Sequence, residues 1–486
     1  MEYEIIIGME VHAELATKTK MFCSCLNAPF ESEPNTNVCP LCLGLPGTLP
    51  VMNKQAVEWT VDLGYDLGAT IATFTKWDRK NYFYPDLPKG YQISQYDFPL
   101  LSGGVLEFRL GDEVKTVRVT RVHLEEDTGK LVHASTTSQE SLRATSKESP
   151  ASFVDFNRAG VPLLELVTEP EIHSAEEAKK FCKTYQFILQ RRGIARADME
   201  KGEMRCEANI SVRPIGQQEF GTKVEVKNLN SFRSVERAIV YEAKRQIAAL
   251  GAGEAIVQET RGWDEAKQQT YTQRRKETAA DYRYFPEPDL PPVTPDALWD
   301  LAAKSRDSFG YPHLEAKAMH HELGIAADVA DFFTSNSEAF AYWTELREEL
   351  AEPTKVQKQQ LQMAASVYTN TDTARQLNPT QLVELAGLVV AGTISHLQVR
   401  RVIDTVVAQG LEPTEVVDKL DLKQVSNEGE LEVIIDGVLA SNQDAVTKYQ
   451  AGEQQVYGYL VGQVMRATKG KANPETVNKI LKEKLV

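Results

Sequence analysis

Long apolar runs are missing from this 486-residue chain. No stretch approaches the ~18 consecutive apolar residues that a membrane-spanning helix needs, and Glu2 and Glu4 follow the first methionine with no basic segment. We therefore expect a cytoplasmic protein with no membrane partner. The patterns G-x-x-x-x-G-K-[ST] and strand-linked G-x-G-x-x-G are missing too, which excludes the common phosphate-binding loops.

Positive charge is in deficit, because the formal net charge is -15. Affinity for nucleic-acid backbones comes largely from Lys and Arg, so the chain as a whole is not suited to coat nucleic acid. A local basic region lies between Thr468 and Val486, where lysines outnumber glutamates. On charge alone, the simpler interpretation of this region is a solvated face of a terminal helix.

Short alternating runs of apolar and charged residues predict half-buried antiparallel strands over 113–127, 205–214 and 222–229. Amphipathic helices are predicted over 173–193 and 231–251. The first part of the chain is therefore expected to be α+β. Five prolines between 284 and 296 mark a domain boundary, and helical patterns follow it to the end of the chain.

Four cysteines lie close together as a C-x-C pair, Cys23 and Cys25, and a C-x-x-C pair, Cys39 and Cys42. This spacing lets four thiolates converge on one tetrahedral zinc ion in a loop over 22–44. The alternatives are two disulfides or a redox-active C-x-x-C pair. A four-thiolate site leaves no open coordination position, so a zinc ion here would fold the loop and take no part in catalysis.

Glu10 and His12 alternate with apolar residues in GMEVHAEL, so both would lie on one face of a strand. Alone, this pattern is typical of a solvated strand face. The segments 78–97, 121–130 and 154–170 add further carboxylates, a histidine and basic residues interleaved with aromatics. Carboxylate oxygens with an occasional imidazole suit Mg²⁺. These residues therefore indicate a Mg²⁺ site, but they do not identify the reaction that takes place there.

Seven motifs occur in order between residues 2 and 292: GMEVHAEL, DRKNYFYPDLPKGYQISQ, HLEEDTGK, VDFNRAGVPLLE, MRCEANISVRP, KNLNSF and DYRYFPEPDLPP. Together they resemble the B-subunit family of aspartyl/glutamyl-tRNA amidotransferases, the GatB family. The segment YGYLVGQVMRATKGKANPETVNKIL resembles the YqeY-like tail of that family. The resemblance implies a mixed or antiparallel-sheet cradle domain over 1–292, an all-α helical domain over 293–375 and a helical YqeY-like tail over 376–486.

The activity implied by the resemblance is indirect synthesis of Gln-tRNA(Gln) and Asn-tRNA(Asn). The family's protein uses ATP and Mg²⁺ to phosphorylate the side-chain carboxylate of Glu or Asp misacylated on tRNA, and ammonia then displaces the phosphate. The ammonia comes from glutamine through a partner amidase (glutaminase), the A subunit. A small third protein, the C subunit, completes the heterotrimer, and the misacylating synthetase is a further expected partner of the tRNA complex.

The resemblance also assigns roles to individual residues. The Mg²⁺ ligands fall on Glu10, His12, Glu165 and the Glu125-Glu126 pair, of which we expect only one member to bind, with preference for Glu126. Lys80, Lys89 and Arg158 would lie near ATP or the acyl group. Arg466, Lys469 and Lys471 are the candidates for tRNA contacts, and the four cysteines match the zinc-bearing branch of the family. The alternative function is a non-catalytic, zinc-stabilised tRNA-binding adaptor.

Overall fold

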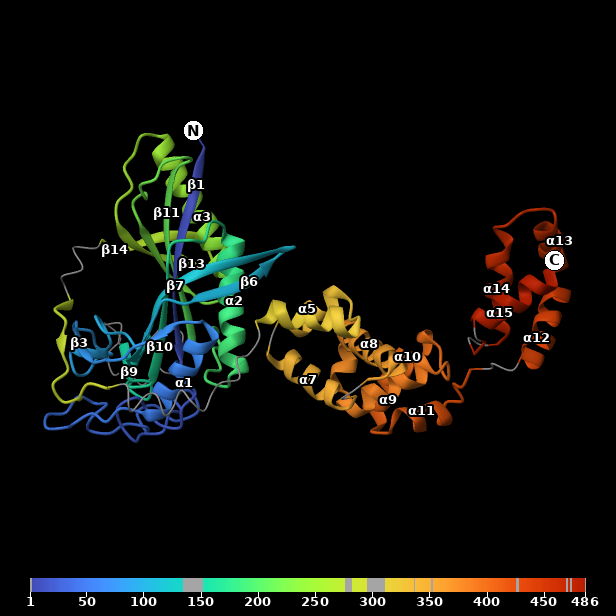
Figure 1. The fold of residues 1–486 in the computed structure, drawn as a ribbon, viewed down its shortest axis with the longest axis horizontal. Helices are drawn as coiled ribbons and strands as arrows, with labels where there is room; N and C mark the ends of the chain where they lie inside the picture. The colour runs from blue at the N-terminus through green and yellow to red at the C-terminus, as the bar shows by residue number, and fades with distance from the viewer. Residues whose placement is uncertain are drawn as a thin grey trace, which may run out of the picture. The chain divides into compact units, whose positions relative to one another are not determined.

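The computed structural model describes residues 2–133, 152–275, 282–294, 311–335, 337–350, 353–424, 428–468, 471–472 and 474–485. The chain divides into two compact units, Met1–His313 and Leu314–Val486, which we describe separately. The first contains a large sheet with helices and the second is helical (Figure 1), which confirms the predicted α+β class. Among the described helices, none is both long and apolar enough to cross a membrane.

Thirteen strands of the described part of the first unit form one sheet, whose main path runs β14-β13-β12-β11-β1-β10-β7-β4-β3-β15. These strands are β1 (Tyr3–Glu14), β3 (Asp78–Asn81), β4 (Tyr91–Ser94), β7 (Glu113–Glu126), β10 (Pro162–Thr168), β11 (Met204–Pro214), β12 (Val224–Leu229), β13 (Glu259–Asp264), β14 (Gln269–Arg275) and β15 (Phe285–Pro286). Strands β2 (Thr70–Ile71), β5 (Leu101–Ser102) and β6 (Val105–Leu110) pair beside this path. Strands β8 (Lys130–His133) and β9 (Ser152–Asp155) pair antiparallel in a separate two-stranded sheet. The strands predicted over 113–127, 205–214 and 222–229 are confirmed as β7, β11 and β12.

Strand β1 lies in the middle of the sheet between β10 and β11 and has two different faces. Met9, Val11 and Ala13 are fully buried in the hydrophobic core. Helices α2 (Ala175–Arg191) and α3 (Phe232–Gly251) lie along the sheet (Figure 1). They pack on this apolar side, where Phe181 of α2 joins the same core. The polar residues between the apolar ones therefore point to the opposite face, away from the two helices.

A third helix of the first unit, α1 (Lys54–Asp66), begins at an Asn53 cap whose side-chain oxygen accepts hydrogen bonds from Gln55 N and Ala56 N. Such a cap satisfies backbone donors that the first turn of a helix leaves free. Val57 and Val61 on α1 are buried in the same core as the sheet. The core of the first unit is therefore continuous from the sheet through all three of its described long helices.

The second unit has two hydrophobic clusters. Helices α5 (Pro312–Leu323), α6 (Ala327–Phe333), α7 (Ser337–Glu348), α8 (Lys355–Asn370), α9 (Pro379–Val390), α10 (Val399–Gln409) and α11 (Pro413–Lys419) share one cluster, which runs from Ala316 to Leu422. Helices α12 (Glu428–Ser441), α13 (Gln443–Gln450), α14 (Val456–Ala467) and α15 (Pro474–Leu485) share the other. The packing of the first cluster is continuous across residue 376, and the domain boundaries drawn from the sequence stay predictions.

Candidate functional site

The candidate site begins with a row of three side chains across neighbouring strands. His12 on β1 lies opposite Glu165 on β10, and Glu165 lies opposite His123 on β7. Residues directly opposite one another in a sheet share a face, so all three point to the polar side. Glu165 Oε2 lies 3.2 Å from His12 Nε2 and 3.4 Å from His123 Nε2. One carboxylate therefore joins the two imidazoles.

Two more carboxylates complete this group, which we call the carboxylate–histidine cluster: Glu10, His12, His123, Glu125 and Glu165. His12 Nε2 lies 3.8 Å from Glu10 Oε1 and 3.8 Å from Glu125 Oε1. His12, Glu125 and Glu165 each offer a ligand atom, and these atoms all lie within 4.8 Å of one another. The structure therefore brings together Glu10, His12, Glu165 and Glu125, one member of the predicted pair, and their role as Mg²⁺ ligands stays a prediction.

The cluster changes the protonation of its own members. Burial raises the pKa of Glu10 to about 7, and the negative charges of Glu165 and Glu207 add to this shift. Burial alone would lower the pKa of His12, but the hydrogen bond and charge of Glu165 raise it to about 9. The pKa of Glu165 lies well below its usual range, because both histidines outweigh its burial. Protons therefore balance part of the negative charge that the carboxylates concentrate here.

The donor set fits a divalent cation. Carboxylate oxygens are the preferred ligands of Mg²⁺, and the cluster provides three carboxylates, together with the imidazole of His12, from β1, β7 and β10. These side chains all lie on paired strands, so the hydrogen-bonded sheet and not a loop sets the distances between the ligands. Lys80 on β3 approaches the same place, with Nζ 3.9 Å from Glu125 Oε2.

Glu126 lies on the other side of β7, and our preference for it as a Mg²⁺ ligand is not supported by its position. Its Oε1 contacts Lys89 Nζ and accepts a hydrogen bond from the backbone N–H of Ile93 at 2.9 Å. Strict alternation places Glu126 and Glu125 on opposite faces of the strand, and His123 shares the face of Glu125. Lys89 is therefore held by Glu126, away from the residues around His12.

Arg158 is engaged by backbone carbonyls next to the cluster. Its Nε donates to the carbonyl of Thr128 at 3.0 Å, and its Nη2 donates to the carbonyl of Gly129 at 2.8 Å. Asp127 lies 3.8 Å from the same guanidinium, and Arg205 forms a closer ion pair with Asp127 at 2.6 Å. These contacts tie Arg158 to the residues just after β7, and its expected contact with ATP or the acyl group stays a prediction.

Two residues beside the cluster were missed by the assignments made from the sequence. Glu207 on β11 lies opposite Glu10, and Lys227 on β12 binds Glu207 with Nζ at 2.6 Å. Glu10, His12 and Glu207 form a second group whose ligand atoms lie within 4.8 Å of one another. Glu207 and Lys227 belong to two of the seven motifs, MRCEANISVRP and KNLNSF, but only the pairing of β11 with β1 shows that Glu207 faces Glu10.

The four predicted zinc ligands also converge. Cys23, Cys25, Cys39 and Cys42 offer sulfur atoms that all lie within 4.8 Å of one another, so the group could hold a metal ion. All six cysteines lie in the described part of the chain and none forms a disulfide. Hydrogen bonds from the Cys23 thiol and the Cys39 backbone N–H lower the pKa of Cys42 to about 4. A thiolate is the form of cysteine that binds a metal, so this shift favours metal binding by the group.

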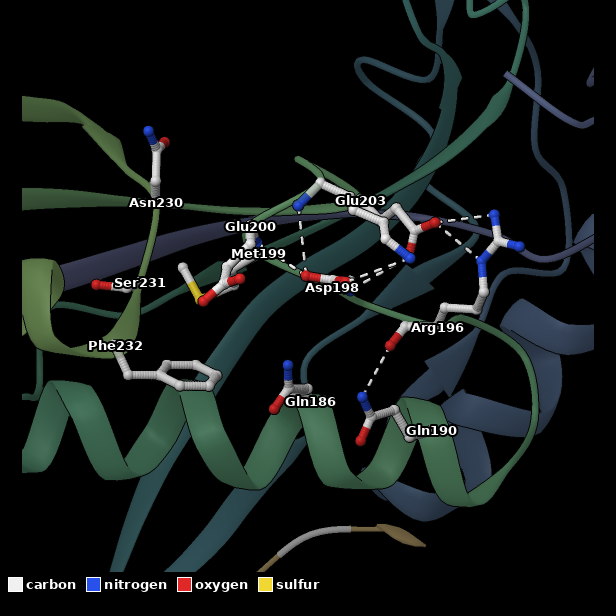
Figure 2. A pocket seen from close by; sticks show the side chains of 11 residues that line it. Gln186, Gln190, Arg196, Asp198, Met199, Glu200, Glu203, Asn230, Ser231 and Phe232 are labelled. Carbon is white, nitrogen blue, oxygen red and sulfur yellow. Dashed lines mark hydrogen bonds and ion pairs between the residues drawn. The ribbon is translucent and has the colours of Figure 1, made fainter. Parts of the chain in front are cut away.

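A separate pocket lies between the C-terminal half of α2 and the turn before α3. Its volume is about 460 Å³, and none of the site residues predicted from the sequence lines it. Its polar groups bind one another, as Figure 2 shows: Gln190 donates to the Arg196 carbonyl at 2.8 Å, and Arg196 pairs with Glu203 at 2.8 Å. Because these groups are already engaged, the pocket does not match the carboxylate–histidine cluster as a candidate site.

Comparison with known families follows the same division of the chain. Residues 5–299 match the family model described as the GatB/GatE catalytic domain, and residues 342–485 match that described as the GatB domain. The chain belongs to the GatB family. The resemblance drawn from the seven motifs is therefore confirmed, and the carboxylate–histidine cluster lies within the part that matches the catalytic-domain model.

Full-length relatives agree with this membership. Two proteins named as the B subunit of aspartyl/glutamyl-tRNA(Asn/Gln) amidotransferase, from Carboxydothermus hydrogenoformans and Thermoanaerobacter pseudethanolicus, are 44% and 46% identical to the chain. The alignments cover 100% of this chain and 99% and 100% of those proteins. The protein of the same name from Picosynechococcus sp. is 44% identical, over 100% of this chain and 98% of its own length.

The predicted tRNA-contact residues lie in the part that matches the GatB domain. Arg466 is exposed in the last turn of α14. Lys471 forms an ion pair with Asp421 at 2.5 Å, so its amine already has an acidic partner. Lys469 lies outside the described residues. The assignment of these three residues to tRNA stays a prediction.

Proposed function

We propose that this chain is the ATP- and Mg²⁺-dependent component of a tRNA-dependent amidotransferase. In the first step, a side-chain carboxylate oxygen of Glu or Asp misacylated on tRNA attacks the γ-phosphorus of ATP, and ADP leaves. In the second, ammonia attacks the carbonyl carbon of the acyl phosphate, and inorganic phosphate leaves. The products are Gln-tRNA(Gln) or Asn-tRNA(Asn). The carboxylate is a poor electrophile, and phosphorylation gives it a leaving group.

The residues of the cluster suit the first of these steps. Glu10, His12, Glu125 and Glu165 would hold Mg²⁺, which when bound stabilises the charge on the transferred phosphoryl group. Lys80 is well placed to orient phosphate oxygens, because its ammonium group lies beside Glu125 and can form charge-assisted hydrogen bonds.

His123 has a positioning role in this proposal. It contacts Glu165 from the side opposite His12, so Glu165 is held between two imidazoles. A carboxylate restrained in this way loses less conformational freedom when it binds a cation. His123 would therefore fix the direction of Glu165 without binding the metal itself.

The proposal includes partners and a second metal. We infer a heterotrimer in which the A subunit is an amidase that releases ammonia from glutamine and the C subunit is small. The tRNA would contact the helical tail through Arg466, Lys469 and Lys471, and the misacylating synthetase would join the complex through the tRNA. The four cysteines would hold structural Zn²⁺, since four thiolates at this spacing leave no coordination position for a substrate. The assembly would act in the cytoplasm, where translation takes place.

The observation that carries the proposal is the convergence of His12, Glu125 and Glu165 in a chain that belongs to the GatB family. The test is to co-purify the chain with its amidase partner and to assay misacylated Glu-tRNA(Gln) and Asp-tRNA(Asn) with ATP and glutamine. We expect ATP hydrolysis that depends on the misacylated tRNA, with amidated product. Tight tRNA binding without any ATP turnover would instead identify the chain as a tRNA-binding adaptor.

A further inference from the structure

A row of tyrosine rings borders the carboxylate–histidine cluster and takes no part in the chemistry described above. Tyr96 stacks on Tyr284, with ring centroids 4.1 Å apart and 11° between the ring planes. Tyr282 lies 6.1 Å from Tyr284 in an edge-on arrangement, and Tyr82 lies 6.0 Å from Tyr282. We call Tyr82, Tyr282, Tyr284 and Tyr96 the tyrosine row. It joins the region of β3 and β4 to the chain just before β15.

Lys80 connects the tyrosine row to the cluster. Its Nζ lies 5.4 Å from the centre of the Tyr282 ring and 3.9 Å from Glu125 Oε2. An ammonium group at this distance from a ring is attracted by the π electrons, so the ring helps to hold the lysine beside the carboxylate. The row and the proposed Mg²⁺ ligands are therefore separated by a single side chain.

The end of the row near Tyr96 is tied to the same carboxylate. Ser94, two residues before Tyr96, donates a hydrogen bond to Glu125 Oε2 at 3.1 Å. Burial raises the pKa of Tyr284 to about 12, and the negative charges of Glu125 and Glu165 add to the shift while Lys80 opposes it. The hydroxyl of Tyr284 is thus close enough to the cluster to be affected by its charges.

Tyr96 presents an open face although its other face is packed. The side chain is 57% exposed while its ring rests on Tyr284. Its backbone N–H donates to Asp78 Oδ2 at 3.3 Å, which holds the residue at the end of β4. Phe83 and Tyr84, which follow Tyr82 in the sequence, are exposed as well. A ring that is fixed from one side and open on the other is suited to stack with a flat ligand.

We propose that the open face of Tyr96 stacks with an unpaired base at the 3′ end of the acylated tRNA, and that this contact sets the amino acid at the carboxylate–histidine cluster. This inference rests on the proposed function. The amino acid is esterified to the terminal ribose, so the last unpaired bases must lie close to the carboxylate that reacts. Every base has a π face, and stacking on an aromatic side chain is worth about 1–3 kcal/mol per base.

Charge and extent favour the tRNA end over the adenine of ATP. Arg283 is exposed and lies between Tyr282 and Tyr284 in the sequence, so this segment carries a positive charge that phosphate groups of a single strand can use. The row contains four rings, whereas one adenine needs one platform. A series of rings interleaved with basic residues is typical of proteins that bind several successive unpaired bases.

A binding experiment with the assembled complex tests the contact directly. The probe is tRNA with 2-aminopurine in place of the 3′-terminal adenosine, since stacking quenches the fluorescence of this base. We expect quenching on binding to the wild-type complex and to Tyr96→Phe, which keeps the ring. Tyr96→Leu should abolish the quenching and weaken binding by about 5- to 150-fold. Tyr284→Leu, which removes the supporting ring, should reduce the quenching.

Phe220→Leu is the matched control. Phe220 is 62% exposed on the same unit and packs under the Arg213 guanidinium, which is not part of the tyrosine row. Its replacement should leave the quenching as in wild type. If Tyr96→Leu quenches as strongly as wild type, no stacking on Tyr96 takes place and the inference is wrong. Thermal unfolding of each variant confirms that the comparison is made between folded chains.

Steady-state kinetics separates the two sources of a base. Tyr96→Leu should raise KM for misacylated tRNA by the same factor and leave KM for ATP unchanged. A raised KM for ATP alone would identify the base as the adenine of ATP and overturn the assignment to tRNA. If the wild-type complex hydrolyses no ATP in the presence of misacylated tRNA, the proposed function fails, while the fluorescence titration still decides whether Tyr96 stacks with a base.

Discussion

Glu125 and Glu126 are neighbours on β7, and their carboxylates point to opposite sides of the sheet. Glu125 lies 3.8 Å from His12 Nε2 within the carboxylate–histidine cluster. Glu126 instead contacts Lys89 and the backbone N–H of Ile93. Two adjacent carboxylates thus have different surroundings, one in the cluster and one beside Lys89. The same substitution at each position therefore compares the two roles directly.

The first prediction concerns Glu125→Gln and Glu126→Gln. Glu125→Gln removes a charged ligand, so we expect Mg²⁺ affinity to fall at least tenfold and tRNA-dependent ATP hydrolysis about 10²-fold or more. Glu126→Gln leaves the partly buried Lys89 without its charged partner, so we expect the free energy of unfolding to fall by about 1–3 kcal/mol with Mg²⁺ affinity nearly unchanged. Calorimetric titration with Mg²⁺ and urea unfolding measure the two effects. A larger loss of Mg²⁺ affinity in Glu126→Gln than in Glu125→Gln would reverse the assignment.

The second prediction is a pH dependence of Mg²⁺ binding. The pKa of His12 is about 9 without metal, so at neutral pH the ring must lose a proton before it can bind a cation. We expect Mg²⁺ affinity to rise with pH, by up to about tenfold per unit between pH 7 and 9. Below pH 7 the slope should be steeper, because Glu10, with a pKa of about 7, is then also protonated.

Titration calorimetry in buffers with different ionisation enthalpies counts the released protons. About one proton per Mg²⁺ is expected near pH 8. His12→Asn should reduce this number, because the amide side chain carries no proton to lose. An affinity that stays constant from pH 6.5 to 8.5 would show that His12 is not a ligand.

The third prediction concerns Asp127, whose carboxylate pairs with Arg205 at 2.6 Å. Burial would raise the pKa of Asp127, but the charges of Arg205 and Arg158 hold it well below its usual range. A depressed pKa in the folded state means that the pair stabilises the fold above the unfolded pKa of about 3.9 and loses this contribution as pH falls below it.

Asp127→Asn should therefore lower the free energy of unfolding by about 1–3 kcal/mol at pH 7, where it removes the carboxylate that contacts two half-buried guanidinium groups. Near pH 3 and below, the difference from wild type should shrink. There the unfolded wild-type chain binds a proton at Asp127 while the folded carboxylate stays charged, so the ion pair contributes less to the free energy of unfolding. Urea unfolding at several pH values measures both. A difference that grows as pH falls would contradict the depressed pKa.

The fourth prediction concerns the four-cysteine loop. The loop is anchored to the end of β9 and the residues after it: the Asn35 N–H donates to Asp155 and the Asn37 N–H donates to Asn157. Gly44, just after the last cysteine, packs so closely on the Lys89 turn that a Cβ would lie 3.0 Å from the Lys89 backbone nitrogen. Removal of the metal should loosen this packing.

We expect about one zinc atom per purified chain, and its loss in Cys25→Ser. In that variant the backbone amides of the loop should exchange hydrogen faster, and protease should cleave the loop more readily. Cys182→Ala is the control, because Cys182 is buried in α2 and contributes nothing to the four-cysteine group. Wild-type zinc content in Cys25→Ser would contradict the assignment of this ligand.

Much of the cluster could be predicted because strand alternation is visible in the sequence. The pattern of GMEVHAEL placed Glu10 and His12 on one face, and the structure confirms that face as the polar side of β1. The same rule separates Glu125 from Glu126, but it does not say which of them shares the face of His12. That choice depends on the pairing of β7 with β10, where His123 lies opposite Glu165.

Other contacts depend on register between distant segments, which alternation does not contain. Glu207 faces Glu10 because β11 pairs with β1, and Lys227 joins them from a third strand. Tyr96 and Tyr284 stack although most of the first unit's sequence separates them. The cysteine group was predictable for the opposite reason, since its four ligands lie within one short loop and their spacing alone limits the geometry.

The two faces of strand β1 link the proposed metal ligands to the hydrophobic core. Met9 and Val11 are locked in the hydrophobic core by the same backbone that presents Glu10 and His12 to the other side. A shift of this strand by one residue would exchange the two sets, burying charges and exposing apolar side chains. Packing in the core thus fixes the positions of the proposed ligands. Substitutions on the apolar face of the sheet, which no substrate contacts, should therefore alter metal affinity as well as stability.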